Sequence, residues 1–239
     1  MIYKSKVLES REVARETMEF TLEKPEGFVY QSGQTIDITL IDPTETDGKG
    51  NIRTFSLVSA PHEPVLKIAM RIRESAFKRV LKSLGNDTEL CIEGPFGSFA
   101  LHKKVERPAV FMAGGIGITP FFSMIKDATE RKLENKIILF YSNRKPGDAA
   151  FLNELQSLQS ANPNFTLVAT MTDMEAGDNS WSGEKGRIDE NMIRRHVAEN
   201  TSPIYYLVGP QVMVEAMRTI LNKMSIDSDD IRFEEFAGY

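Results

Sequence analysis

The sequence predicts two domains: an antiparallel Greek-key β-barrel over residues 1–105, followed by an α/β domain with a doubly wound parallel sheet over residues 106–239. Three observations predict this order. Apolar and polar residues alternate in short segments up to about residue 105, as in strands with one solvated face. Beyond that point the apolar residues form continuous runs, which strands buried on both faces of a parallel sheet require. A glycine-rich turn joins the first of these runs to a helical pattern.

The first half is built from short alternating segments, and several such segments within about 100 residues are typical of a barrel. Clusters of turn residues separate them, as between 42 and 51. A single helix is predicted to begin near Ser75, which is a plausible N-cap residue. The alternating segments lie at residues 18–22, 36–40, 66–72 and 90–92.

The second half is built from continuous apolar runs with helical patterns between or after them. The clearest helix spans 212–224, where apolar residues recur on one helical face. A basic stretch at 103–107 separates the two halves and marks the predicted boundary. The four apolar runs lie at 109–113, 137–141, 165–169 and 204–208.

Composition excludes several classes of function. The net charge is −5 and there is no polybasic run, so we expect no nucleic-acid partner. No stretch approaches the roughly 18 apolar residues of a transmembrane segment, and no targeting segment is recognisable, so a cytoplasmic location is expected. Cys91 is the single cysteine and cannot form an internal disulfide. His62, His102 and His196 are scattered without ligand spacing, so we expect no metal site.

The strongest local motif is the turn Gly114-Gly115-Ile116-Gly117-Ile118-Thr119-Pro120, placed between an apolar run and a helical pattern. Glycines let the backbone approach phosphates closely, and the helix start offers amides and a positive dipole. Proline in the first helical turn removes no needed donor. The motif therefore predicts a dinucleotide site, and the alternative is a tight turn that only packs helix against sheet.

A second motif, Arg53-Thr54-Phe55-Ser56, lies in a predicted strand of the first half. It is followed by Met70-Arg71, by the helix start Ser75-Ala76-Phe77-Lys78 and by Gly94-Pro95-Phe96-Gly97. In content and order, with the glycine turn, these motifs resemble the ferredoxin-NADP reductase family. The resemblance covers nearly the whole chain, including Gly33-Gln34, Gly209-Pro210 and Glu235-Phe236.

The resemblance implies a bound FAD. Arg53 would pair with the flavin pyrophosphate, Phe55 would pack on the isoalloxazine, and Ser56 would hydrogen-bond near its N5. Thr54, Met70 and Arg71 are the other flavin candidates on strands. The helix start at 75–78 would present its amides and the Lys78 ammonium to the pyrophosphate, which favours FAD over FMN. Taken alone, the Arg53 motif is equally well read as an edge strand with an exposed arginine.

The carboxyl-terminal residues are apolar and aromatic, whereas chain ends are usually polar. In the family an aromatic residue near this end covers the flavin face that the nicotinamide must reach. Phe236 is the better match and Tyr239 the alternative, with a terminal strand that packs its own side chains as the structural explanation. Ser56 and Phe236 are the candidate catalytic residues.

The resemblance also implies a set of NAD(P) contacts, with NADPH or NADH as co-substrate. Arg144 or Arg187 could meet a 2′-phosphate, and the choice between the two nucleotides stays open. Many family members carry a cysteine before the Gly209-Pro210 turn, and Val208 stands there in this chain. The predicted contacts are Gly114, Gly115, Gly117, Thr119, Pro120, Ser142, Asn143, Arg144, Gly209, Pro210 and Met213.

The resemblance predicts a flavoprotein that takes hydride from NAD(P)H and passes electrons to a separate acceptor. The acceptor would be a ferredoxin, a flavodoxin, an oxygenase component or a small molecule. One cysteine cannot ligate a plant-type iron–sulfur cluster, so flavin alone is expected. Three alternatives stay open: a reductase of diffusible flavin, an electron-transfer subunit of a larger complex, and a nucleotide-binding regulatory module without turnover.

Overall fold

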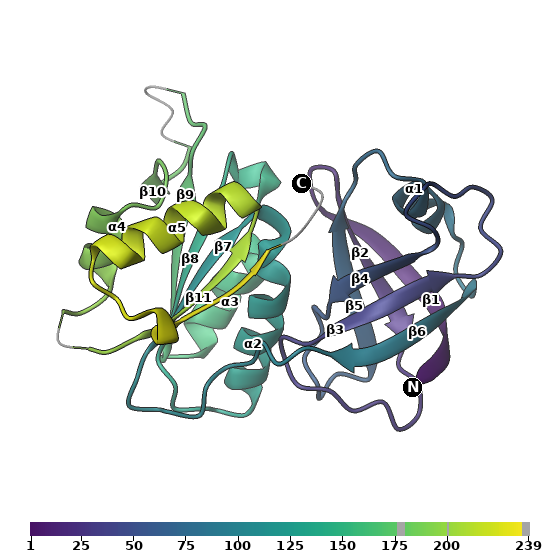
Figure 1. Cartoon of the computed structure of the whole chain (residues 1–239), viewed down its shortest axis with the longest axis horizontal. Coiled ribbons are helices and arrows are strands. Elements are labelled where there is room, and N and C mark those ends of the chain that lie inside the picture. Colours follow the sequence, from purple (N-terminus) through teal and green to yellow (C-terminus); the bar gives the residue numbers. More distant parts are fainter. Residues whose placement is uncertain (176–179, 200, 236–239) are drawn as a thin grey trace.

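The computed structural model describes residues 1–175, 180–199 and 201–235. Two six-stranded sheets form two halves that lie side by side (Figure 1). The predicted fold class is confirmed, because an antiparallel sheet is followed by a parallel sheet with helices on both faces. The predicted domain boundary after residue 105 falls between β6 (Glu89–Phe96) and β7 (Ala109–Gly114), and it stays a prediction.

The first sheet has the strand order β4-β3-β6-β1-β2-β5, and all its pairs are antiparallel. A bridge between Leu57 and Ile68 joins its two edge strands into a barrel. Alternate residues of the strands point inward and form an apolar cluster, which α1 (Ala76–Ser83) covers with Phe77, Val80 and Leu81. The other strands are β1 (Ile2–Ala14), β2 (Thr17–Glu23), β3 (Thr35–Leu40), β4 (Ile52–Ser56) and β5 (Val65–Arg71).

The second sheet has the order β10-β9-β8-β7-β11-β12, and all its pairs are parallel. The four predicted apolar runs are the central strands β7, β8 (Ile137–Asn143), β9 (Phe165–Met171) and β11 (Ile204–Gly209). The edge strands β10 (Glu184–Lys185) and β12 (Ile231–Glu235) are short and partly polar, so neither forms a continuous apolar run in the sequence.

Helices cover both faces of the parallel sheet (Figure 1). The face toward the barrel packs against α2 (Ile118–Glu130) and α3 (Leu152–Ala161), and the opposite face packs against α4 (Glu190–His196) and α5 (Gln211–Lys223). Short 3-10 turns are η1 (Gly115–Gly117), η2 (Pro146–Asp148) and η3 (Ser228–Asp230). No helix within the described ranges is long and apolar enough to cross a membrane.

Helix α2 is buried on two sides, toward the sheet and toward the barrel. On the sheet side the Phe121 ring stacks on Phe111 of β7 with centroids 4.5 Å apart. The Phe122 ring stacks on Phe151, the N-cap residue of α3, at 4.6 Å. Barrel residues Val58, Ala69 and Phe99 belong to the same apolar cluster. The barrel half thus covers a side of α2 that the parallel sheet leaves free.

Polar residues of α2 meet polar groups of the barrel half. The Ser123 hydroxyl donates to the Ser59 carbonyl at 2.6 Å, and the Ser32 hydroxyl donates to the Asp127 carboxylate at 3.2 Å. Lys126 forms an ion pair with Glu63. These contacts hold the two halves in one relative orientation, because a buried polar group that loses its partner costs about 1–3 kcal/mol.

Candidate functional site

The glycine turn lies at the carboxyl edge of the parallel sheet, where β7 and β11 end side by side. A Cβ atom on Gly117 would lie 2.4 Å from the Val208 carbonyl oxygen, and one on Gly209 would lie 3.2 Å from the Gly114 nitrogen. Gly115 has a φ of +53°, a conformation that favours glycine. Gly114, Gly117 and Gly209 thus allow the glycine turn and the end of β11 to pack directly against each other.

The structure brings the other predicted nucleotide residues to the same edge. Pro210 precedes α5, and a Cβ on Gly114 would lie 2.3 Å from the Met213 sulfur. Ser142 of β8 is the sheet neighbour of Gly114. Pro120 lies in the first turn of α2, and the Thr119 hydroxyl donates to the Ile116 carbonyl within the turn. This is the place where ligands bind in open parallel sheets.

In the barrel, Arg53 and the start of α1 converge on one carboxylate. The Arg53 Nη2 donates to Asp47 Oδ1 at 3.0 Å, and the Ala76 backbone nitrogen donates to Asp47 Oδ2 at 3.1 Å. Arg53 also lies over the Phe77 ring, 5.3 Å from its centroid. Ser75 is the N-cap residue of α1, but its side chain accepts no capping hydrogen bond. Arg53 and Ala76 therefore form an anion site that already holds an anion of the chain.

Further cations surround this anion site. The Lys78 ammonium donates to the Arg71 carbonyl at 2.9 Å. Burial lowers the pKa of Lys78, and the charges of Arg73, Arg53 and Lys49 lower it further. The repulsion that these charges exert on Lys78 is reduced when an anion binds beside it. This cluster suits a phosphate group.

Three predicted cofactor residues carry buried polar atoms that have no hydrogen-bond partner among the described residues: Ser56 Oγ, Arg71 Nε and Asn143 Nδ2. Both ring nitrogens of His102 are the other such atoms. Because an unpaired buried polar group is costly, native chains usually supply a partner. A hydroxyl, a guanidinium nitrogen and an amide are the donors that a flavin and a nucleotide can satisfy. The residues present therefore fit FAD and NAD(P)H.

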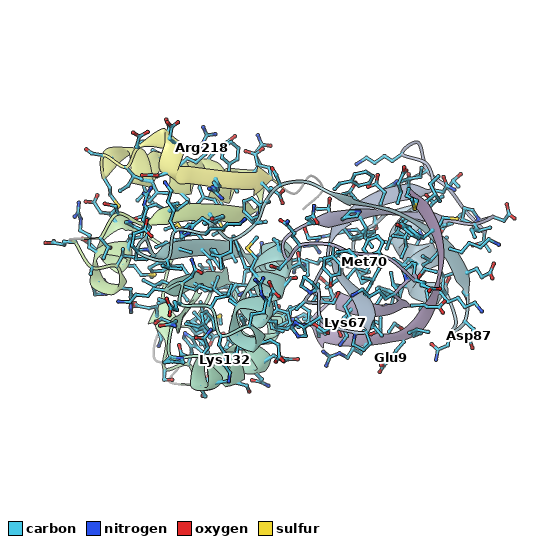
Figure 2. All side chains as sticks on the ribbon, turned by 90° about the horizontal axis from the view of Figure 1, so that it is seen from below. Glu9, Lys67, Met70, Asp87, Lys132 and Arg218 are labelled. Carbon is cyan, nitrogen blue, oxygen red and sulfur yellow. The ribbon has the colours of Figure 1, made fainter. Side chains whose placement is uncertain are left out.

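Other predicted flavin residues face the barrel interior or their own strand neighbours. Phe55 packs against Phe77 with ring centroids 5.9 Å apart, and it belongs to the barrel cluster. Met70 is 2% exposed within the same cluster, and Figure 2 shows it on the side of the barrel nearer the second half. The Thr54 hydroxyl donates to Asp37. Because the Met70 side chain is buried in this cluster, any contact of Met70 with flavin would involve backbone atoms.

A cavity of about 300 Å³ lies between the two halves and is lined by residues of both. Arg71, the last residue of β5, and Arg144, which directly follows β8, line this same cavity. Arg187 does not line it. The sequence separated Arg71 and Arg144 into a flavin group and a nucleotide group, and the fold joins them. The complete lining is Arg15, Glu16, Arg71, Arg73, Arg144, Lys145, Asp148 and Asp173.

A larger interdomain cavity of about 740 Å³ lies against the segment that connects the halves. Its walls include His62, His102 and Asp127, and none of the residues predicted as cofactor contacts. Among the described residues, no group of three His, Cys, Asp or Glu side chains could hold a metal ion. The two predicted cofactor residues that line a cavity, Arg71 and Arg144, therefore both lie at the smaller one.

Glu234 is a candidate site residue that the sequence analysis missed. The register of β12 places it beside Val208, one residue before the Gly209-Pro210 turn. Burial raises its pKa to about 7. Arg232 and Glu234 are two residues apart in the sequence. That spacing was the available signal, because in a strand it places both side chains on the same face. Phe236 and Tyr239, the predicted flavin aromatics, lie outside the described residues.

Comparison with known proteins gives a consistent family pattern. A family model described as an oxidoreductase NAD-binding domain matches residues 111–219. Reductase component 2 of a Comamonas terephthalate 1,2-dioxygenase is 28% identical over 87% of this chain and 60% of its own length. One subunit of the Na⁺-translocating NADH-quinone reductase of Actinobacillus succinogenes is 30% identical over 78% of this chain and 49% of its own length. This chain thus spans only half to three-fifths of the length of these relatives.

A solved structure extends the similarity to both halves of the fold. The ferredoxin NADP⁺ reductase from Neisseria gonorrhoeae, solved with bound FAD and NADP, superposes with a TM-score of 0.81. The alignment covers 98% of this chain and 98% of the other, with 19% identity. The match therefore covers the barrel, the parallel sheet and the order in which they follow one another.

The packing at the glycine turn predicts that Gly117→Ala destabilises the protein. The added methyl group would overlap the Val208 carbonyl oxygen, a backbone atom that cannot move without shifting β11. We expect a loss of about 1–3 kcal/mol in the free energy of unfolding, measured by urea denaturation. Gly147→Ala is the matched control, because nothing lies within 4 Å of the added carbon. Equal stability of the two variants would contradict the packing argument.

The raised pKa of Glu234 predicts a specific pH dependence of stability. A carboxyl group whose folded pKa is about 7 binds its proton more tightly in the folded state, so its contribution to stability falls as the pH rises toward 7. Glu234→Gln removes that loss. We expect its melting temperature, relative to the original protein, to be higher at pH 8 than at pH 5.

The neighbouring Glu235→Gln serves as the control, because Glu235 is exposed. Its melting temperature relative to the original protein should not change between the two pH values. A difference for Glu234→Gln that is the same at pH 5 and pH 8 would show that burial does not raise this pKa.

Proposed function

We propose that this chain, which belongs to the ferredoxin-NADP reductase-like oxidoreductases, binds FAD in its barrel half and transfers electrons from NAD(P)H to a separate acceptor. The family consists of NAD(P)H-dependent flavoprotein reductases. The observation that carries the proposal is the set of buried donors without partners on Ser56, Arg71 and Asn143. These donors come from both halves, as a reaction between two bound nucleotides requires.

In the barrel half, Arg53, Lys78 and the Ala76 amide would hold the flavin pyrophosphate. Their charges and hydrogen bonds suit two adjacent phosphates, and the fork of Arg53 can donate to two oxygens at once. Ser56 would donate its hydroxyl proton to the flavin ring near N5. Bound FAD would accept two electrons from NAD(P)H and release them singly or in pairs.

In the second half, the glycine turn would receive the nucleotide phosphates and Pro210 with Met213 would border the nicotinamide side. Gly114, Gly117 and Gly209 let the turn and the strand ends pack directly against one another. The backbone amides of the turn would then face the phosphates at the edge of the sheet. Arg144 would meet the adenosine part of the nucleotide from the shared cavity. Glu234 beside Val208 would supply a carboxyl group able to hold a proton near neutral pH.

The proposed acceptor is a one-electron protein such as a ferredoxin, a flavodoxin or an oxygenase component. The relatives support this class, because one is the reductase component of a dioxygenase and another is a subunit of a quinone reductase. A small-molecule acceptor or a diffusible flavin is the alternative. The donor set of the pyrophosphate site favours a retained FAD, because free flavin exchange needs no such set of cations.

The direct test is an absorption spectrum of the purified protein, reconstituted with FAD and then mixed with NADH or NADPH without oxygen. We expect flavin bands that bleach with at least one of the two nucleotides. Steady NAD(P)H oxidation with ferricyanide would then exclude a regulatory module without turnover. Failure to retain FAD after reconstitution would overturn the proposal.

The proposed pyrophosphate contact predicts that Arg53→Ala weakens FAD binding. Hydrogen bonds to charged groups are worth about 1.5–3 kcal/mol, so the dissociation constant should rise roughly tenfold or more. Fluorescence quenching of FAD during titration measures it. Lys82→Ala, which removes an exposed cation from the last turn of the same helix, should leave the constant within about twofold. Equal effects of both variants would point to general electrostatics instead of a contact.

The shared cavity predicts that Arg144→Ala raises the KM for the nucleotide roughly tenfold while kcat changes little, because the residue binds and does not react. Arg187→Ala is the control, since Arg187 lies outside the cavity. Steady-state kinetics with NADH and NADPH measure both values. An effect on NADPH that exceeds the effect on NADH would identify a 2′-phosphate contact. An unchanged KM for both nucleotides would exclude Arg144 from the site.

A further inference from the structure

The loop between β3 and β4, residues 41–51, lies against the start of α1 and is called here the acidic loop. Its Asp47 carboxylate is fully engaged. One oxygen accepts from Arg53 at 3.0 Å and from the Lys49 backbone nitrogen at 2.9 Å, and the other accepts from the Ala76 backbone nitrogen at 3.1 Å. The two oxygens thus contact the two groups of the proposed pyrophosphate site.

A second carboxylate fastens the same loop to α1. Glu45 accepts two hydrogen bonds from Arg79, at 2.8 Å and 2.7 Å. Arg79 follows Ala76 by one helical turn, so the two contacts fix the loop along the amino-terminal half of the helix. Arg53 Nη1 also donates to the Lys49 and Gly50 carbonyls of the loop, at 2.8 Å and 3.0 Å. The acidic loop is therefore held at the anion site by Asp47, by Glu45 and by these two carbonyls.

The electrostatic setting explains why a carboxylate lies there. The charges of Arg73, Arg53 and Lys49 act on the neighbouring Lys78 ammonium. Arg53 and two backbone amides hold the pKa of Asp47 below its usual range, and the backbone contact with Lys49 contributes most. An anion is thus favoured at this point whether the chain or a ligand supplies it.

We propose that Asp47 is a built-in competitor of the flavin pyrophosphate, and that the acidic loop must release Arg53 and the α1 amide before FAD can bind fully. The inference rests on the proposed function, because it assumes that the pyrophosphate takes the site formed by Arg53 and Ala76. Two anions cannot share one arginine fork and one amide. The attached loop therefore weakens the apparent binding of FAD. The apparent dissociation constant equals the intrinsic constant divided by the fraction of chains in which the site is free.

The substitution Asp47→Asn separates charge from shape. The single asparagine oxygen can still accept from one of the two backbone nitrogens, Lys49 or Ala76. The negative charge opposite Arg53 is gone, and the hydrogen bonds from Arg53 to the Lys49 and Gly50 carbonyls remain. We expect the FAD dissociation constant of the flavin-free protein to fall about fivefold, the ratio for releasing one partly exposed ion pair. Riboflavin, which lacks phosphate, should bind with an unchanged constant.

The matched control is Asp42→Asn at the start of the same loop. It removes the same charge, and the Asp42 side chain makes no hydrogen bond or ion pair with another described residue. Its FAD constant should stay within about twofold of the original. Equal tightening by both variants would assign the effect to the overall charge of the loop and overturn the inference. Weaker FAD binding by Asp47→Asn would show that Asp47 positions Arg53 for the phosphate, which also overturns it.

A measurement on the unaltered protein provides a second test. Hydrogen exchange of residues 41–51 should increase when FAD binds, because the loop loses its attachment at Asp47. Riboflavin should cause no such increase. Slower exchange with FAD would contradict release of the loop. Failure of the proposed function is distinguishable, because then neither the original protein nor any variant would bind FAD.

Discussion

The burial of α2 between the parallel sheet and the barrel is the constraint on which the rest of the structure depends. A helix with only one apolar face would leave Ser123, Lys126 and Asp127 in water. In this chain they meet Ser59, Glu63 and Ser32 of the barrel, and Phe121 and Phe122 fill the sheet side. Because α2 begins directly after the glycine turn, its position also determines where the turn lies relative to the barrel. The cavity lined by Arg71 and Arg144 is a consequence of that arrangement.

Charge is the second organising feature. The chain gathers cations at the start of α1 and at the junction of the two halves, and each group is partly neutralised by a carboxylate of the chain. Asp47 forms an ion pair with Arg53. The Glu16 Oε2 atom lies 3.8 Å from Arg71 Nη2 and 3.4 Å from Arg73 Nη1. Such pairs keep the cations in place without strong stabilisation, since exposed ion pairs contribute about 0–1 kcal/mol. Weak internal partners of this kind can yield to a ligand with a higher charge.

Much of the fold followed from local pattern. Alternation with period two predicted the antiparallel half, and continuous apolar runs predicted β7, β8, β9 and β11. The helix starts near Ser75 and Val212 are close to α1 and α5. The edge strand β10 escaped prediction because two partly polar residues form no periodic signal, and a strand at the position of β12 was only the alternative explanation of the aromatic carboxyl end. Their pairing depends on the strands beside them, which lie far away in the sequence.

The sequence by itself determined the order of the two halves, the glycine turn and the family to which the motifs point, because these depend on neighbouring residues and on backbone geometry. Only the tertiary structure decided which side chains meet. It paired Asp47 with Arg53 and the start of α1, buried Phe55 against Phe77, and placed Glu234 beside Val208. The physical reason is that burial and electrostatic partners are set by residues far apart in the chain. No local pattern records which of them the folded chain will bring together.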